Sequence, residues 1–273
     1  MSKEICGVCK LCGKQKRLTF EHLPPQKAFN SFSVKVFPPE EVLKLMSGKD
    51  GRKPWETNGL KGQIQQGGSG DFFLCKECNN KTGAWYAREY VEFTRKIHLH
   101  LSQCEGISPR KACSLVLQDI YPLRVLKSIM VMFCDIYEDC FGDEDLRSFL
   151  LDKKSMAFNP EKYSLYIYFT KGPFLRKLPL QHRFMPGYGF VHVSEISHYP
   201  LGLLLFINKP KDFQPQGTNI TSFCQYDYDY SCNYHFFGVP FLEVNTSLVL
   251  DYRSKKEVLM DEEKLALVLP SKQ

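Results

Sequence analysis

Short β-like runs and longer helical periods divide the chain into regions of different secondary structure. Residues 17–22 (RLTFEH) are rich in β-branched and aromatic side chains and stop just before the prolines at 24–25. This predicts a short strand, because proline cannot donate to a sheet ladder. The prolines at 38–39 precede EEVLKLM. Proline and acidic residues in a first turn favour a short helix, which we expect to end by Gly48.

After residue 79 the apolar positions follow a helical period. Aromatic and aliphatic side chains recur at three- and four-residue steps, as an amphipathic helix requires, at Trp85, Tyr86, Tyr90, Phe93 and Ile97. Residues 122–137 and 143–154 continue this helical character, and the second of these segments opens with acidic residues suited to a helix N-terminus. We therefore expect several helices that pack on one another.

Beyond Asn159 the pattern changes to short β-like runs separated by proline, glycine and asparagine turns. The runs are KYSLYIYF, YGFVHVSEI, LGLLLFIN, TNITSFCQY, HFFGVPFLEV and TSLVLDYR. The predicted fold class is α+β, with an N-terminal module at residues 1–104, a helical connecting region at 105–158 and a mainly antiparallel β domain at 159–273. The β-rich part gives no signal for a particular ligand, so its role as a recognition or regulatory domain is open.

Composition and charge narrow the choice of partners. The chain has 273 residues, of which 43% are apolar, which is ample for a packed core. It contains no uninterrupted apolar run of about 18 residues, so we expect a soluble protein with no membrane partner.

Residues 1–104 carry 17 lysines and arginines against 10 aspartates and glutamates, whereas the rest carries 19 against 20. A basic excess confined to one part favours a polyanion such as nucleic acid as partner.

Residues 47–70 are rich in glycine, polar and basic residues and show no sustained period. This predicts a long loop, and loops of this length are usually functional or disordered. Basic residues such as Lys53 would contact phosphates there while Trp55 stacks on a base. A solvated insertion is the alternative interpretation.

The cysteines are arranged for metal binding. Eleven cysteines form an odd number, and no apolar signal segment follows Met1, which favours a reducing, cytoplasmic setting over disulfides. Two Cys-x-x-Cys pairs, Cys9/Cys12 and Cys75/Cys78, are the usual ligand set of a closed tetrahedral zinc site. Cys6 also stands in a Cys-x-x-Cys spacing with Cys9, so Cys6 and Cys12 compete as ligands. Gly13 permits a tight turn after Cys12 and favours the second choice, with Cys6 as a spare thiol.

Three polar residues near the cysteine pairs suit phosphodiester hydrolysis. Glu21 and His22 follow the first pair, and Asn79 directly follows the second. A neutral imidazole is well matched to accept a proton from water at neutral pH, and a hard cation such as Mg²⁺ prefers carboxylate and amide oxygens. Neighbouring residues in an extended strand point to opposite faces. Glu21 and His22 can therefore act together only if the strand ends or bends there, as the following Pro-Pro would allow.

This ordered set of motifs resembles the HNH or ββα-metal (His-Me finger) endonucleases, in particular their endonuclease VII-like branch with a four-cysteine zinc site. The resemblance covers roughly residues 6 to 95, about a third of the chain. It implies an HNH-like nuclease domain at residues 1–104. In such a domain the four cysteines hold structural Zn²⁺, His22 is the general base, and Glu21 and Asn79 hold a catalytic Mg²⁺ or Mn²⁺.

The sequence departs from the family pattern in two respects and leaves one cation ligand open. Glu21 stands where aspartate is more usual, which adds a methylene to the acid. Asn80 is an alternative to Asn79 as a cation ligand. The middle polar residue that many such nucleases place before the second cysteine pair has only Asp71 as its nearest counterpart.

The leading functional hypothesis is a metal-dependent endonuclease acting on DNA, with RNA as a further candidate substrate. Its β-rich half would select substrate, form a homo-oligomer or restrain the nuclease, as in bacterial or phage defence effectors. The alternative is a non-catalytic zinc-ribbon protein that binds nucleic acid or a protein partner. Candidate phosphate contacts are basic residues close to the motifs, namely Lys16, Arg17, Lys53, Lys76, Lys81 and Arg88.

Overall fold

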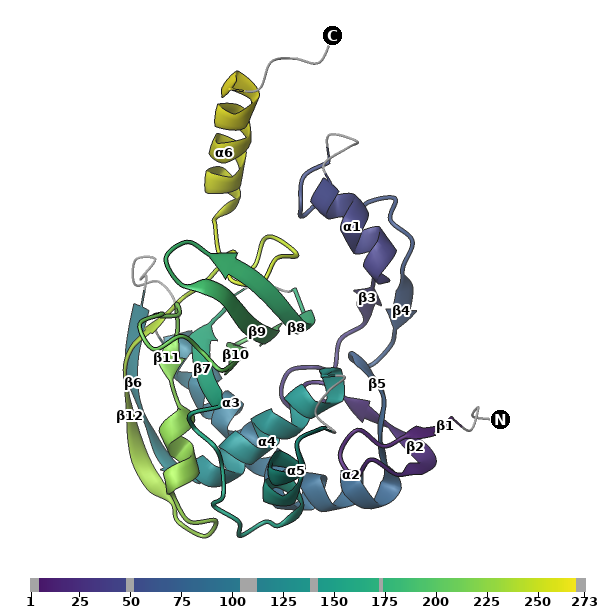
Figure 1. The fold of residues 1–273 in the computed structure, drawn as a ribbon, viewed down its shortest axis with the longest axis vertical. Coiled ribbons are helices and arrows are strands. Elements are labelled where there is room, and N and C mark those ends of the chain that lie inside the picture. The colour runs from purple at the N-terminus through teal and green to yellow at the C-terminus, as the bar shows by residue number, and fades with distance from the viewer. Residues whose placement is uncertain (1–4, 48–51, 104–111, 138–141, 172–173, 269–273) are drawn as a thin grey trace.

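A computed structural model describes residues 5–47, 52–103, 112–137, 142–171 and 174–268. These residues form a mixed α+β structure with a C-terminal antiparallel sheet, which confirms the predicted fold class at that level (Figure 1). Within these ranges no helix is both long enough and apolar enough to cross a membrane.

The N-terminal part is built on a three-stranded antiparallel sheet with strand order β1-β2-β5. Its elements are β1 (Cys6–Val8), β2 (Gln15–His22) and β5 (Gly70–Cys75), and helix α2 (Lys76–Thr82) begins directly after β5. The predicted strand at 17–22 is confirmed and begins two residues earlier. β2 and β5 are far apart in sequence, and their antiparallel pairing brings the Glu21-His22 pair next to the segment that leads into Cys75.

The chain between β2 and β5 forms an insertion that projects from the rest of the molecule (Figure 1). It contains β3 (Val34–Val36), α1 (Pro39–Ser47) and β4 (Gln63–Gln65), and β3 pairs with β4 in antiparallel register. Helix α1 confirms the helix predicted after the prolines at 38–39. Of the loop predicted at 47–70, residues 48–51 lie outside the described ranges. The rest of the prediction is corrected, since Ser47 ends α1, Gly70 begins β5 and β4 lies between them. β4 escaped prediction because it has three residues and pairs with a strand nearly thirty residues away.

The central helices carry the predicted helical period. They are the π-helix η1 (Gly83–Ala87), α3 (Arg88–Gln103), α4 (Pro122–Ile136) and α5 (Glu144–Leu151). Tyr90, Phe93 and Ile97 lie on one buried face of α3, as their spacing predicted. α4 is buried along almost its whole length and forms the centre of the main core.

A five-stranded antiparallel sheet forms the C-terminal half, with strand order β11-β7-β10-β9-β8. One of its faces packs on the main core and the other on a second, smaller apolar cluster. The strands are β7 (Tyr163–Phe169), β8 (Arg176–Met185), β9 (Gly189–His198), β10 (Leu201–Ile207) and β11 (Thr218–Asn219). β8 was not among the predicted runs because its burial pattern alternates irregularly and its pairing with β9 is interrupted between Leu178 and Gln181.

The region predicted as a helical connection also contains a strand. β6 (Ala112–Ile120) pairs antiparallel with β12 (Cys232–Pro240), so residues from the middle of the chain form a ribbon with the C-terminal part. The main core is continuous from Cys9 to Val239 and crosses the predicted boundaries at residues 104 and 158. The helical signals on either side of β6 hid this nonlocal pairing from the sequence pattern.

Two of the β-like runs after Asn159 differ from the prediction. Within TNITSFCQY, residues Thr221–Gln225 form the 3-10 helix η3, and the run that begins at Thr246 forms bends and a turn that lead into helix α6 (Lys255–Val268). Between these runs, the residues just before Cys232 form turns in which Tyr226 and Tyr230 stack. Alternating aromatic residues at 226–230 suit a strand, but no neighbouring strand pairs with them in the described structure.

Candidate metal centre and catalytic residues

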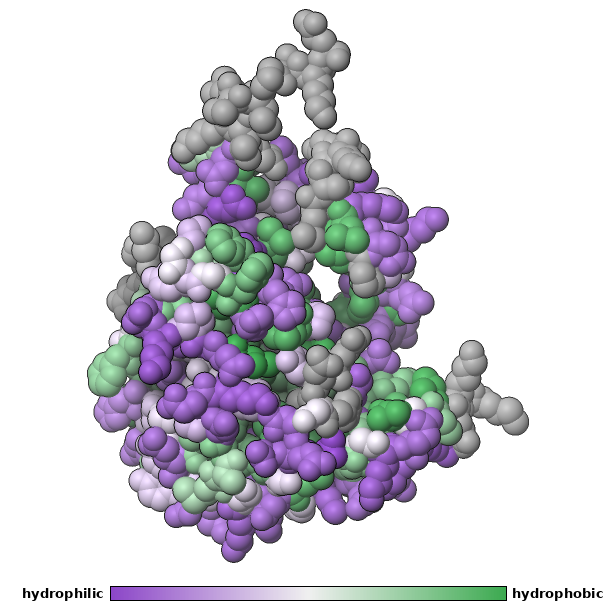
Figure 2. Space-filling model, in the orientation of Figure 1, coloured by the Kyte–Doolittle hydropathy of each residue, from purple (hydrophilic) through white to green (hydrophobic). Residues whose placement is uncertain are grey.

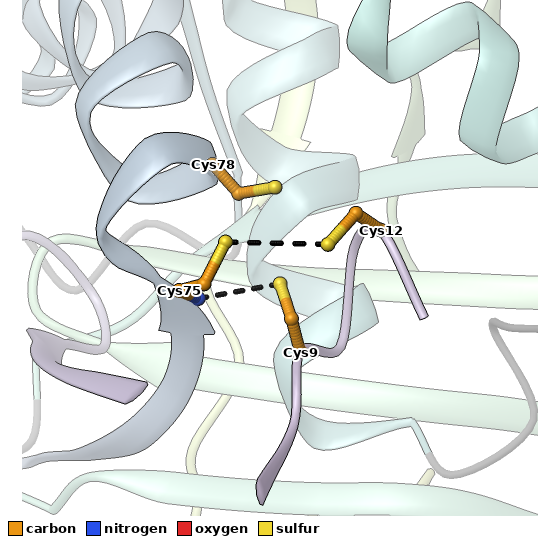
Figure 3. A group of neighbouring side chains, drawn as sticks. All are labelled: Cys9, Cys12, Cys75 and Cys78. Atoms are coloured by element: carbon orange, nitrogen blue, oxygen red, sulfur yellow. Dashed lines mark hydrogen bonds between the residues drawn. The ribbon is translucent and has the colours of Figure 1, made fainter. Parts of the chain in front are cut away.

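The four predicted zinc ligands lie together at one end of the N-terminal sheet (Figure 3). Their Sγ atoms lie within 4.8 Å of one another, and three of the four cysteines are buried. Cys9 and Cys12 come from the turn between β1 and β2, whereas Cys75 ends β5 and Cys78 lies in α2. Among the described residues this is the one group of three or more cysteine, histidine or acidic side chains close enough to hold a metal.

The turn that carries Cys9 and Cys12 depends on Gly13. Gly13 has a φ of +67°, which glycine adopts without steric cost, and its N–H donates to Cys9 O over 2.9 Å. Cys9 N–H donates to Lys14 O over 3.0 Å and closes the same turn. Cys6 lies outside the group, exposed in β1 and opposite Arg17 of β2. The structure therefore groups Cys12, rather than Cys6, with the other three cysteines.

The cysteine geometry fits a tetrahedral zinc ion. A Zn–S bond of about 2.3 Å places neighbouring sulfurs about 3.8 Å apart, and Sγ of Cys12 lies 4.0 Å from Sγ of Cys75. The amide of Cys75 donates to Sγ of Cys9 over 3.3 Å. The hydrogen bond from the Cys78 thiol, aided by backbone N–H groups, lowers the pKa of Cys9 to about 4 despite burial, and the same hydrogen bond raises the pKa of Cys78. Thiolate is the form that binds zinc, and four thiolates leave no open position for substrate.

His22 ends strand β2 and has one ring nitrogen committed to the backbone. Its Nε2 lies 3.1 Å from Gly67 O. A carbonyl oxygen only accepts, so Nε2 carries a proton, and in the neutral imidazole Nδ1 then holds the lone pair. Within the described parts of the chain no hydrogen bond engages Nδ1. The half-buried ring packs edge-to-face on Phe20, with the centroids 5.1 Å apart, so the two side chains share one face of β2.

Glu21 projects from the opposite face of β2, where it pairs with Asp71 of β5. Its Oε2 atom is buried and has no hydrogen-bond partner. Burial raises the pKa of Glu21 to about 7, and the charge of Cys9 acts in the same direction. A buried carboxylate oxygen without a donor is costly, and a bound cation would remove that cost.

Asn79 lies in α2 and is oriented by strand β2. Its Nδ2 donates to Thr19 Oγ1 over 3.0 Å, and Thr19 Oγ1 in turn donates to Leu74 O over 3.0 Å. With the amide nitrogen held in this way, Oδ1 remains the available ligand atom. Thr19 and Glu21 are two residues apart in β2, so Asn79 contacts the face from which Glu21 projects. Asn80 is exposed, and no hydrogen bond orients its side chain in the described structure.

The predicted phosphate contacts differ in their surroundings. Lys16 and Lys81 both bind Glu77, each over 3.1 Å, so one carboxylate lies between two lysines at the surface. Lys76, Arg17 and Arg88 are exposed. Lys53 lies in the insertion, where its N–H donates to Glu56. Contact of these six residues with phosphate stays a prediction.

Two residues that position the backbone beside His22 were not predicted from the sequence. Asn30 is buried, donates to Pro24 O and Ser69 O over 2.6 and 2.7 Å, and accepts from Ser69 N over 2.8 Å. Gly68 lies against it with a φ of +114°, and a Cβ there would come within 2.0 Å of Asn30 O. Together they hold the Gly67 carbonyl beside His22. An asparagine shortly after a Pro-Pro pair and a Gly-Gly pair were the available signals, but only tertiary structure brings them together.

A second unpredicted contact comes from the C-terminal sheet. Lys177 of β8 donates from Nζ to Ser69 Oγ over 2.6 Å, between residues more than a hundred positions apart in sequence. It joins β8 to the loop that precedes β5.

No family model, no curated protein and no solved structure matches this chain.

Proposed function

We propose that the protein is a metal-dependent endonuclease that hydrolyses phosphodiester bonds of DNA. His22 is the general base, Glu21 and Asn79 hold a Mg²⁺ or Mn²⁺ ion, and the four cysteines hold a structural Zn²⁺. The observation that supports this most directly is the hydrogen bond from His22 Nε2 to Gly67 O. It fixes the tautomer in which Nδ1 is free to take a proton from water.

The cation ligands are supported by their unused oxygen atoms. Asn79 Oδ1 is available because Nδ2 is held by Thr19, and Glu21 Oε2 is buried without a donor. Both are hard oxygen ligands, Glu21 from β2 and Asn79 from α2, and the cysteine group joins the turn before β2 to α2. A divalent cation bound there would neutralise charge on the phosphate and polarise its P–O bond.

His22 and Glu21 leave β2 on opposite faces, Asn79 of α2 contacts the face of Glu21 through Thr19, and β2 ends at His22. We therefore assign them to two sides of the strand end, where a phosphodiester could contact the cation on one side and receive water activated by Nδ1 on the other. The zinc group supports this arrangement without taking part in the chemistry, since its four thiolates complete the coordination of the ion.

A plasmid-nicking assay with Mg²⁺ or Mn²⁺ tests the proposal on the full-length protein and on His22→Ala. The matched control is His100→Ala, because His100 also bonds a backbone carbonyl, Val116 O, over 2.9 Å but lies on α3. We expect cleavage by the parent and by the His100 variant and a loss of about a hundredfold or more with His22→Ala, as removal of a general base predicts.

Zinc content and thermal unfolding of each variant show whether the fold is intact. Equal cleavage by the parent and His22→Ala would exclude His22 as the base. Binding of DNA or of a protein partner without cleavage under any divalent cation would favour the non-catalytic zinc-ribbon alternative.

A further inference from the structure

A cavity of about 430 Å³ lies between the N-terminal insertion and the C-terminal sheet. One wall is formed by β3, α1 and the segment around Trp55, and the other by the start of β8 and the residues 244–247. Ser69 also lines it. The molecule is visibly hollowed between these two parts (Figure 2). A cavity of this size falls in the range of about 300–1,000 Å³ that is typical of small-molecule pockets.

The charged side chains that line this cavity are all basic. They are Lys35, Arg176 and Lys177, and no acidic residue is among the lining residues. Arg176 is neutralised by a buried ion pair with Glu195. Lys177 differs, because its Nζ bonds the neutral hydroxyl of Ser69 and, in the described part of the chain, no carboxylate lies within ion-pair distance. Burial lowers the pKa of Lys177, while the more distant charge of Asp71 opposes this. An anion in the cavity would stabilise this ammonium group.

Aromatic rings line the same cavity. Trp55 and Phe37 come from the insertion and Phe174 from the chain just before β8. Phe174 is 43% exposed, so its ring is not buried in the core. Lys255 Nζ lies over the Trp55 ring at 5.4 Å from its centroid, and this places another cation close by. Aromatic rings interleaved with cations are the usual composition of sites for unpaired nucleic acid, where bases stack and phosphates meet lysines.

The cavity is connected to the candidate catalytic residues through Ser69. Leu23 N–H, directly after His22, donates to Ser69 O over 2.9 Å, and the His22 ring bonds Gly67 two residues before Ser69. Lys177 bonds the side chain of the same serine. A strand segment held in the cavity would therefore lie next to the end of β2.

We propose that this cavity binds an unpaired segment of a nucleic-acid strand, with a base stacked on Trp55 and a phosphate on Lys177. The inference rests on the proposed nuclease function and specifies its substrate as single-stranded or locally unpaired nucleic acid. A regular duplex presents its bases stacked internally and offers Trp55 no free base face.

Binding in the absence of a divalent cation separates this inference from catalysis. Fluorescence anisotropy would compare a short labelled single-stranded oligonucleotide with the same sequence as a blunt duplex, using the full-length protein in magnesium-free buffer and a gel to show that the strand stays intact. We expect the single strand to bind more tightly, and Trp55→Ala and Lys177→Gln each to weaken that binding by about tenfold, the scale of one lost stacking or phosphate contact.

Two control variants test specificity. Trp55→Phe keeps a ring and should retain most of the affinity, while Lys154→Ala removes an exposed lysine outside the cavity and should leave the affinity unchanged. Tryptophan emission should be quenched by the single strand in the parent and not in Trp55→Phe, since the other tryptophan, Trp85, packs against the core. Thermal unfolding of every variant verifies the fold.

Equal affinity for duplex and single strand, or unchanged single-strand affinity in folded Trp55→Ala and Lys177→Gln, would overturn this inference. Either result leaves the proposed nuclease intact if His22→Ala still abolishes cleavage. Conversely, strand binding through Trp55 and Lys177 with cleavage unaffected by His22→Ala would support the cavity and exclude the catalytic assignment. Tight binding of free mononucleotides, undiminished relative to the oligonucleotide, would also overturn the choice of a strand.

Discussion

Asn79 and Thr19 are joined by a hydrogen bond from Nδ2 to Oγ1 over 3.0 Å, which ties helix α2 to strand β2. The bond orients the one amide among the candidate cation ligands, and the Thr19 hydroxyl is itself fixed by Leu74 O. An indirect partner of this kind sets the direction of a ligand without contacting the cation.

Thr19→Val should weaken cation binding while leaving the zinc group in place. Valine has nearly the same shape but no hydroxyl, so the Asn79 amide is free to rotate. We expect the Mg²⁺ concentration needed for half-maximal cleavage to rise by about tenfold to a hundredfold, the usual effect of losing such a partner. Thr19→Ser should restore the parent value. Thr94→Val serves as the control, because Thr94 is a buried threonine that bonds Val91 O on α3. An unchanged Mg²⁺ requirement in Thr19→Val would argue against Asn79 as a ligand.

Metal analysis of the purified protein should find one zinc ion per chain. Cys78→Ser should lose that zinc, because Cys78 belongs to the four-cysteine group, whereas Cys6→Ser should retain it, because Cys6 is exposed outside the group. Loss of zinc should also lower the unfolding temperature, since binding free energy of a structural zinc is folding free energy. Zinc retained in Cys78→Ser and lost in Cys6→Ser would reverse the ligand assignment.

Asp143 should contribute stability that depends on pH. It caps α5 by accepting from Leu146 N over 2.8 Å, and it also accepts from Lys162 and Tyr163. Burial opposes its ionisation, but these hydrogen bonds prevail and lower its pKa to about 2 from 3.8. In the native state the carboxyl releases its proton at a lower pH than in the unfolded state. Its contribution is therefore complete above about pH 4 and is lost as pH falls through about 2.

Urea unfolding of Asp143→Asn and Asp143→Ala between pH 2 and pH 7 tests this. At pH 7 we expect Asp143→Ala to lose about 1 to 2 kcal/mol through the missing cap, and Asp143→Asn to lose less because asparagine still caps a helix. The difference between the parent and Asp143→Asn should shrink as the pH approaches 2. A difference that is constant over this range would show that the charge of Asp143 contributes nothing.

The buried pair of Arg176 and Glu195 should be sensitive to removal of one partner. Arg176 Nη2 lies 2.6 Å from both carboxylate oxygens, Nη1 donates to Thr246 O and Leu248 O, and Glu195 is fully buried. Glu195→Ala leaves the guanidinium buried without its counterion, so we expect a loss of about 3 to 5 kcal/mol in the free energy of unfolding.

Chemical denaturation measures this loss. The control is Glu92→Ala, which removes one partner of the exposed ion pair between Glu92 and Arg95 and should change the free energy of unfolding by less than about 1 kcal/mol. A small effect of Glu195→Ala would mean that water reaches this pair.

The sequence by itself determined the local features of this protein. The strand at Glu21 and His22, helix α1, the helical period of α3, and the α+β class all follow from side-chain pattern, because residues close along the chain decide those elements. The cysteine spacing, together with Gly13 after Cys12, likewise predicted which four thiols assemble, since each Cys-x-x-Cys turn places two sulfurs on the same side.

Only the tertiary structure decided how distant segments meet. The pairing of β6 with β12, the position of β8 beside Ser69, and the cavity between the insertion and the C-terminal sheet join residues up to more than a hundred positions apart. Local pattern carries no record of such pairings, because their free energy comes from burial and hydrogen bonds that form only when distant parts of the chain meet during folding. The same reason explains why Asn30, Gly68 and Lys177 gave no functional signal as single residues. Their significance lies in the groups that folding brings against them.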